Sequence, residues 1–282
     1  MNYRHAYHAG NHADMLKHVV LARVIEHLRK KDKPFRVIDA HAGIAVYNLR
    51  GIEAGKTGEW QTGIGKMAEP FAPEVEALIA AYRSCVAAVN GGGALDFYPG
   101  SPEIAARLMR ATDRMTANEL HAEDHQALAD WFRSDRRVTV TKLDAEACIK
   151  AALPPPERRG LILIDPPYEA SDEAARALRS IGQGLRRFAS GVFMLWYPVK
   201  AGGIGEQISA AVCALGAART LRIELHIREI FKGGGLAGSG LIIINPPWRL
   251  DAELRLLLPA LAGRLGLGQF GQGNVGWLVP PA

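Results

Sequence analysis

The chain contains 282 residues, of which 48% are hydrophobic and 22% are charged, close to the averages for folded proteins. This composition excludes a disordered chain, and a length of 282 residues corresponds to roughly two structural units at about 150 residues each. The 34 Lys and Arg residues outnumber the 29 Asp and Glu residues, so the net charge is +5. Such an excess favours an anionic partner without requiring one.

The cysteines and the N-terminus indicate the cellular compartment. Cys85, Cys148 and Cys213 are isolated in the sequence, so they form no C-x-x-C pair. The pattern therefore indicates neither a zinc knuckle nor a disulfide framework, and it is typical of the reducing cytoplasm. The N-terminus has no apolar signal-peptide core, and no uncharged run has the composition of a membrane span. We expect a cytoplasmic protein that does not enter a membrane.

From Phe35 onward, short apolar runs alternate with amphipathic ones. The runs that predict buried strands are residues 35–39, 115–120, 138–144, 160–165, 191–197, 221–230 and 240–245. The patterns that predict helices between them are residues 101–111, 123–133, 172–188, 205–217 and 251–265. This alternation predicts an α/β fold, a doubly wound and mostly parallel seven-stranded sheet with helices on both faces.

One stretch interrupts the alternation. Residues 44–98 contain no convincing strand before residues 95–98, but they contain one clear helix over 73–90, which three glycines follow. We therefore predict a helical insertion subdomain, residues 44–94, carried by a Rossmann-like domain that comprises residues 1–43 and 95–282. Ahead of the first strand we expect an extended tip and a helix capped near Asn11.

The most informative motif is Asp165-Pro166-Pro167-Tyr168, which directly follows an apolar run. Open α/β sheets bind their ligands at the carboxyl ends of their strands. The motif offers a carboxylate, backbone carbonyls that the prolines leave free, and a flat ring. Two acceptors and a stacking surface suit a planar amine on a heterocycle, with Tyr168 against the ring. The structural alternative is a Pro-Pro turn that merely ends a strand.

A second segment, Asn245-Pro246-Pro247-Trp248, repeats this layout with an amide in place of the acid. In methyltransferase-like sheets the cofactor loop follows the first strand and the catalytic turn follows the fourth. Asp165 ends the fourth predicted strand, whereas Asn245 ends the seventh. We therefore predict that Asp165 is catalytic and that Asn245 marks a structural turn.

A cofactor loop is predicted where the first strand runs from Asp39 into Ala40-His41-Ala42-Gly43, because small residues let the backbone approach a ligand closely. Glu119 closes the second predicted strand, where an acid typically holds ribose hydroxyls. Asp144 closes the third, in position to meet an adenine amine. Three acids on successive strand ends predict a nucleoside cofactor.

The N-terminal segment is rich in histidine. A metal site at His5, His8, His12 and His18 with Asp14 is one interpretation, but a helix cap at Asn11 keeps His8 and His12 from sharing a helical face. Polar contacts to RNA or to the cofactor are therefore favoured over metal. Nearby aromatic and cationic side chains suit stacking and phosphate contacts on a nucleic acid. A basic, glycine-rich loop at residues 231–236 is in addition a candidate for closing over a substrate.

The N-terminal string from Tyr3 to His18 resembles that of the RlmJ family, bacterial 23S ribosomal RNA adenine-N6 methyltransferases. Residues 39–43, 98–102 and 158–168 are also similar to this family, and the similarity extends to Pro280. The Asp-Pro-Pro-Tyr turn alone indicates only an amino methyltransferase. The histidine-rich opening is much more specific.

The resemblance implies S-adenosylmethionine as the methyl donor and 23S ribosomal RNA as the partner. From the N-terminal residues themselves we expect no metal. The resemblance also implies that Asp165 is catalytic and that the cofactor contacts are His18, His41, Ser101, Glu119, Asp144, Ala145 and Asp165. It also implies that Tyr3 approaches the RNA, which Pro166 and Tyr168 would also contact. We expect a monomer. The chain departs from the family at Ile44-Ala45 and at Ala145, where glycines are expected.

Two other functions remain open from the sequence. The same turn serves any planar amine, so a DNA adenine or protein glutamine methyltransferase is an alternative within the enzymes. A catalytically silent RNA-binding protein that keeps the fold is an alternative from another class. The presence of Asp165, Glu119 and Asp144 argues against loss of activity.

Overall fold

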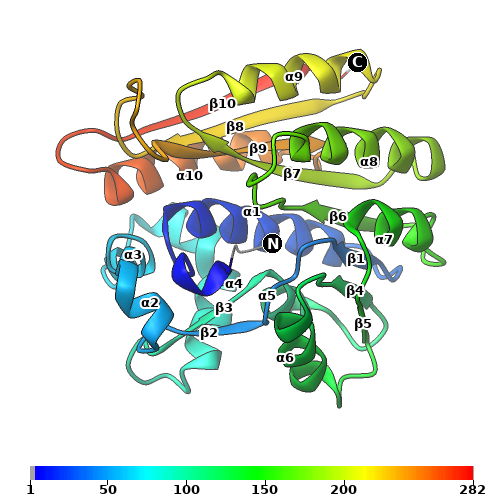
Figure 1. Cartoon of the computed structure of the whole chain (residues 1–282), viewed down its shortest axis with the longest axis horizontal. Coiled ribbons are helices and arrows are strands. Elements are labelled where there is room, and N and C mark those ends of the chain that lie inside the picture. Colours follow the sequence, from blue (N-terminus) through cyan, green and yellow to red (C-terminus); the bar gives the residue numbers. More distant parts are fainter. Residues whose placement is uncertain (1–3, 282) are drawn as a thin grey trace.

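The computed structural model describes residues 4–281 (Figure 1), and an eight-stranded sheet lies at its centre. The strand order is β10-β8-β9-β7-β6-β1-β4-β5. The strands are β1 (Arg36–Asp39), β4 (Arg114–Asn118), β5 (Val138–Thr141), β6 (Gly160–Ile164), β7 (Val192–Val199), β8 (Thr220–His226), β9 (Gly238–Ile244) and β10 (Gln272–Val279). Strands β5, β4, β1, β6 and β7 are mutually parallel, whereas β9 and β10 run against their neighbours. The predicted doubly wound α/β fold is confirmed.

The sheet has one strand more than the seven predicted. The additional strand is β10, which pairs antiparallel with β8 at the edge of the sheet. Its sequence, QGNVGWLV, contains two glycines and an asparagine, and none of its residues is fully buried. An exposed edge strand with few β-formers lacks the apolar run by which central strands are recognised.

Helices cover both faces of the sheet (Figure 1). They are α1 (His12–Arg29), α2 (Ile52–Thr57), α3 (Glu59–Thr62), α4 (Pro73–Val89), α5 (Ser101–Leu108), α6 (Ala122–Phe132), α7 (Ala145–Ala152), α8 (Glu173–Arg187), α9 (Ile204–Ala214) and α10 (Leu250–Leu265), with 3-10 turns η1 (His5–Tyr7) and η2 (Ile64–Met67). Alternate strand residues point to opposite faces. Leu161 and Leu163 belong to the core that includes α1, α4, α5, α6 and α10, while Ile162 and Ile164 belong to the core with α7, α8 and α9.

Helix α1 begins where the sequence predicts. The Asn11 side chain caps it by accepting hydrogen bonds from the backbone N–H groups of Ala13 (2.9 Å) and Asp14 (3.0 Å). The helix is then buried along most of its length between the sheet and helices α4 and α5. Its first turns therefore carry Lys17 and His18 into the interior of the protein.

The segment between β1 and α5 contains one strand that the sequence analysis missed. Strand β2 (Val46–Asn48) pairs antiparallel with β3 (Phe97–Pro99) in a separate two-stranded sheet. With only three residues, β2 is too short to leave a periodic pattern. Helix α4 ends at Val89, and Gly91 and Gly92 follow in the left-handed region, as the glycines predicted. The insertion over 44–94 stays a prediction. Strand β2 lies inside this range, whereas its partner β3 lies outside it.

The topology creates one binding crevice. Strand β1 pairs with β4 on one side and with β6 on the other, so the order of strands reverses between β1 and β6. Ligands of open α/β sheets bind at such a switch point, outside the carboxyl ends of the strands. Strand β8 is parallel to β7 because both are antiparallel to β9. The loop after β8 therefore opens at this same edge.

Within residues 4–281, no helix is long and apolar enough to cross a membrane.

Candidate active site

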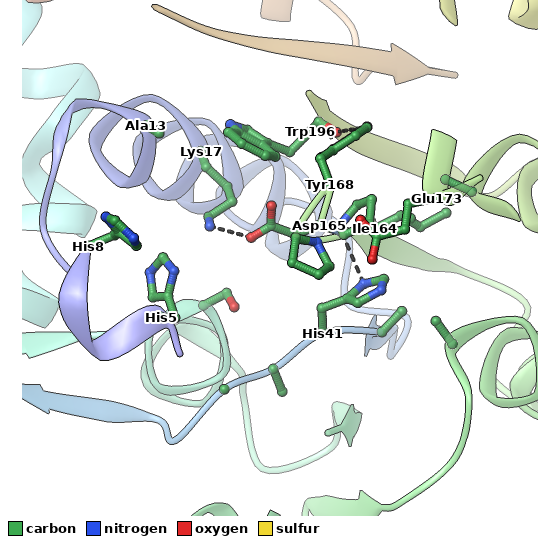
Figure 2. A pocket seen from close by; sticks show the side chains of 18 of the residues that line it. His5, His8, Ala13, Lys17, His41, Ile164, Asp165, Tyr168, Glu173 and Trp196 are labelled. Carbon is green, nitrogen blue, oxygen red and sulfur yellow. Dashed lines mark hydrogen bonds and ion pairs between the residues drawn. The ribbon is translucent and has the colours of Figure 1, made fainter. Parts of the chain in front are cut away.

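A cavity of about 470 Å³ lies at the carboxyl edge of the sheet (Figure 2). The loops after β1, β4, β5, β6 and β7 and the N-terminal segment line it. It brings together nine of the residues selected from the sequence, namely His18, His41, Ser101, Glu119, Asp144, Ala145, Asp165, Pro166 and Tyr168. The tenth, Tyr3, lies outside the described residues.

The turn after β6 is tied to the loop after β1. The backbone N–H of Asp165 donates a hydrogen bond to Nδ1 of His41 at 3.1 Å. Burial lowers the pKa of His41 to about 4, so at neutral pH its ring is uncharged and offers Nδ1 as an acceptor. This bond fixes the backbone of the predicted catalytic residue against the predicted cofactor loop.

A lysine from α1 reaches the same turn. The Lys17 ammonium forms an ion pair with Oδ2 of Asp165 (Figure 2). It forms a second one, at 3.1 Å, with Oδ1 of Asp14. Only 4% of Lys17 is exposed. Sequence reasoning gave Lys17 no role, although a charged residue among the apolar residues of a buried helix is itself a signal of a functional contact.

The aromatic residue of the turn is fixed in the cavity wall. Tyr168 has a φ of 54°, in the left-handed region that costs a non-glycine residue about 1–2 kcal/mol. Its hydroxyl donates to the backbone carbonyl of Trp196 at 2.7 Å, and the two rings meet edge to face at 5.6 Å. These contacts hold the ring at a defined place beside Asp165.

The acid at the end of β1 is fully buried. Burial raises the pKa of Asp39 to about 6, against hydrogen bonds from the Ser101 side chain and from the His41 backbone. Its Oδ2 atom has no hydrogen-bond partner within residues 4–281. Gly100 is the N-cap of α5, and the hydroxyl of Ser101, the first residue of that helix, bonds to Asp39.

Glu119 follows β4 and shapes the loop after β1. Its carboxylate accepts hydrogen bonds from the backbone N–H groups of Gly43 (2.9 Å) and His121 (2.8 Å), while burial raises its pKa. A Cβ atom on Gly43 would lie 2.0 Å from the Tyr47 hydroxyl, and the φ of Gly43 is 64°. Only glycine fits this position. Ala45, where a second glycine was expected, also has a positive φ, of 70°.

Asp144 does not close a strand, contrary to the prediction. Strand β5 ends at Thr141, and Asp144 is the N-cap of α7, accepting a hydrogen bond from the Glu146 N–H at 3.0 Å. Its other oxygen pairs with Arg176. Asp144 and Ala145, the first residue of α7, nevertheless line the cavity.

The N-terminal histidines bind other side chains of the protein. His5 pairs with Asp14 at 2.9 Å and His8 with Glu59 at 3.0 Å. Nδ1 of His18 is 2.8 Å from the Tyr98 hydroxyl, and burial lowers the pKa of His18 to about 3. The described part of the chain contains no group of three His, Cys, Asp or Glu residues that could hold a metal ion.

Asn245 forms a structural turn, as predicted. Its side-chain amide donates to the backbone carbonyls of Ala189 (2.8 Å) and Gly191 (2.9 Å), which precede β7. Since β9 is antiparallel to β7, this turn lies at the edge of the sheet opposite the cavity.

A switch-point cavity with an acid-Pro-Pro-aromatic turn after the fourth strand of the main sheet is the arrangement of a Rossmann-like methyltransferase. The family described as "Ribosomal RNA large subunit methyltransferase D, RlmJ" matches residues 32–279. The chain belongs to this family.

Individual relatives agree with this assignment. The chain is 41% identical over 283 residues to "Ribosomal RNA large subunit methyltransferase J" of Escherichia coli K12, covering 99% of both proteins. It is 40% identical to the protein of the same name from Haemophilus influenzae, again with 99% of both covered. A crystal structure of a Legionella pneumophila protein, 32% identical, superposes with a TM-score of 0.85 over 96% of this chain and 98% of that one.

Proposed function

We propose that the protein transfers a methyl group from S-adenosylmethionine to the N6 amine of a specific adenine in 23S ribosomal RNA. Its relatives are named as methyltransferases of large-subunit ribosomal RNA, which supports RNA as the substrate. The observation that carries the proposal is the turn at Asp165, held by Lys17 and His41 in the cavity that the loop after β1 also lines. A ribosomal RNA substrate implies action in the cytoplasm.

The cavity suits a cationic nucleoside cofactor. Its volume, about 470 Å³, is within the range of roughly 300–1,000 Å³ for small-molecule sites. Acidic side chains in its wall outnumber Lys and Arg, of which only Lys17, Arg176 and Lys200 are present. The Glu119 carboxylate accepts backbone N–H groups of Gly43 and His121, and since its two oxygens have four lone pairs, acceptor capacity remains for a ribose hydroxyl.

The proposed cofactor contacts are side chains and backbone of the cavity wall, namely His18, His41, Ser101, Glu119, Asp144, Ala145 and Asp165. When bound, S-adenosylmethionine supplies an electrophilic methyl group on a sulfonium. His41 of the cofactor loop accepts a hydrogen bond from the backbone of Asp165. The cofactor and the target adenine would therefore be positioned by two segments that are directly bonded to each other.

The lone pair of adenine N6 is delocalised into the ring, so the amine is a poor nucleophile until it is held. The Asp165 carboxylate and the Pro166 carbonyl would accept its two N–H groups and orient its lone pair. Such positioning accounts for much of the rate enhancement. Carboxylates are too weakly basic to deprotonate a neutral amine beforehand. As the new N–C bond forms, the S–CH3 bond of the donor would break and release the thioether, and the N6 proton would pass to Asp165.

A paired adenine has to leave its helix to reach this turn, at a cost of a few kcal/mol. Tyr168, fixed by Trp196, would stack on the extruded base. We also propose that Tyr3 approaches the RNA and that the enzyme acts as a monomer.

The test of the catalytic assignment is Asp165→Asn. The amide keeps the size of the side chain but cannot accept the proton, so turnover on 23S RNA should fall by at least about 1,000-fold. The dissociation constant for S-adenosylmethionine, measured by calorimetry, should rise far less than turnover falls, because the six other proposed cofactor contacts remain. Turnover near the wild-type rate would show that another residue of the cavity wall carries the chemistry.

A further inference from the structure

The loop between β8 and β9, residues 227–237, takes no part in the chemistry described above. It leaves β8 at the carboxyl edge of the sheet, and its residues Gly235 and Leu236 line the same cavity as Asp165. The Ala237 N–H donates to the Val199 carbonyl at 2.8 Å, which places the end of the loop beside Lys200, another residue of the cavity wall. The loop therefore stands at the mouth of the site.

This loop presents an aromatic ring to solvent. Phe231 is 56% exposed, so most of the stabilisation that burial gives a phenylalanine is absent. The Arg228 guanidinium lies 5.5 Å from the ring centroid. Its Nε atom also donates to the Leu236 carbonyl at 3.2 Å, which ties the two sides of the loop together. The ring is thus held in place at the surface by a side chain that is itself anchored.

The loop carries more positive than negative charge, with Arg228 and Lys232 against Glu229. Lys232 follows Phe231 and is exposed, and Lys200 is exposed at the end of β7. Glu229 is the one acidic residue of the loop. An exposed aromatic ring among cations is the combination with which proteins bind single-stranded nucleic acid, because bases stack on the ring and the cations contact phosphates.

We propose that Phe231 stacks on an unpaired nucleotide of the RNA next to the target adenine, and that Lys232 contacts a phosphate of the same strand. This inference rests on the proposed function, since it takes RNA as the substrate. The loop then binds the RNA strand that leads into the cavity, whereas Asp165 and Tyr168 bind the target base itself. Phe231 would thus be a residue at the mouth of the cavity that positions the RNA substrate.

Steady-state kinetics on unmodified 23S RNA test the stacking. Phe231→Ala should raise KM for the RNA by roughly tenfold, which is within the range measured for loss of one base–aromatic stack, and should leave kcat and the affinity for S-adenosylmethionine unchanged. Phe231→Tyr, which keeps a ring, should retain the wild-type KM. Phe231→Leu, which is apolar but has no π face, should behave like Phe231→Ala.

The chain offers a matched control at Trp248, which is 83% exposed and lies at the opposite edge of the sheet. Trp248→Ala removes an exposed aromatic from the same molecule and should leave KM unchanged. Lys232→Gln should reduce the slope of log Kd against log salt concentration by about 0.7, the value for one phosphate contact on a single strand.

The possible failures are distinguishable. If the wild-type protein does not methylate RNA, both the proposed function and this inference are wrong. If it methylates RNA and Phe231→Ala has the wild-type KM, only the stacking is wrong. A wild-type KM for Phe231→Leu, or an equal effect of Trp248→Ala, would also overturn it.

Discussion

Lys17 and Asp165, 148 residues apart in the chain, form an ion pair between the first helix and the turn after β6. The pair lies over the carboxyl edge of the sheet, and Asp14 on the same helix is its third member. Helix α1 thus contributes directly to the position of the acid at the centre of the proposed chemistry. The cap at Asn11 sets the start of that helix, so the histidine-rich opening of the chain determines where Lys17 stands.

Replacing Lys17 by methionine should impair both stability and turnover. Two carboxylates, Asp14 and Asp165, would lose their shared cation, and breaking a buried ion pair from one side costs about 3 kcal/mol or more. Without its partner the Asp165 carboxylate is less well placed, so kcat should fall by about 100-fold. Urea unfolding and single-turnover kinetics measure the two effects.

Lys66 provides the control for this substitution. Its ammonium donates to the Gly266 carbonyl, and the residue does not line the cavity. Lys66→Met should therefore cost only about 1 kcal/mol and leave kcat unchanged. A Lys17→Met enzyme with the wild-type kcat would show that the ion pair does not position Asp165.

Tyr168 should act through its ring more than through its hydroxyl. Tyr168→Phe loses one hydrogen bond, to Trp196, worth about 1 kcal/mol, so kcat/KM should fall by no more than about fivefold. Tyr168→Ala loses the stacking surface, worth about 1–3 kcal/mol per base, and kcat/KM should fall by roughly 10- to 100-fold. Initial rates at limiting RNA give both values. Equal losses in the two variants would assign the role to the hydroxyl.

Stability should decrease as the pH is lowered. Burial lowers the pKa of His12 and His41 to about 4 and that of His18 to about 3, below the value of about 6.5 for an unfolded histidine. Below pH 6.5 these residues therefore take up protons in the unfolded state and not in the native state. The pKa of Asp39 is raised by burial to about 6. As the pH falls, Asp39 is therefore protonated in the native state before it is protonated in the unfolded state, and this offsets the effect of one of the three histidines.

The three histidines and Asp39 give a net difference of 3 − 1 = 2 protons, which predicts a loss of at most about 2–3 kcal/mol of unfolding free energy between about pH 6 and pH 5. The raised pKa of Glu119 reduces this loss. His12 does not line the cavity, so His12→Asn isolates one contribution. It should reduce this pH dependence by roughly 1.4 kcal/mol per pH unit. Urea unfolding at the two pH values measures it, and an unchanged dependence in the variant would contradict the assignment of a neutral buried His12.

Local sequence signals identified most of the sheet and most of the cavity wall. The apolar run before Asp165 and the small residues after Asp39 each predicted a loop at the correct edge, because these signals lie within a few neighbouring residues. A charge on an otherwise buried helix marks Lys17 locally, but its partner Asp165 is 148 residues away, so no local pattern identifies the partner. Strand β10 was missed because it is half exposed, and Asp144 was misplaced because strand ends are blurred where a helix cap follows directly.

The fold itself makes a prediction at Gly240 in β9. A Cβ atom there would lie 2.2 Å from the ring of Tyr197. That ring cannot easily move aside, because its hydroxyl donates to Glu224 at 2.8 Å. Gly240→Ala should therefore lower the unfolding free energy by about 2–3 kcal/mol. Gly276→Ala, in β10 with open space around the new Cβ, should change it by less than about 0.5 kcal/mol. Equal stability of the two variants in urea would contradict this packing.

The central claim is methyl transfer to adenine N6 in 23S RNA, and isotope transfer tests it most directly. The protein is incubated with tritium-labelled S-adenosylmethionine and unmodified 23S RNA, and the RNA is then digested to nucleosides. The account predicts label in N6-methyladenosine, with none above background for Asp165→Asn. Label in DNA or protein instead, or binding of RNA without any transfer, would contradict it.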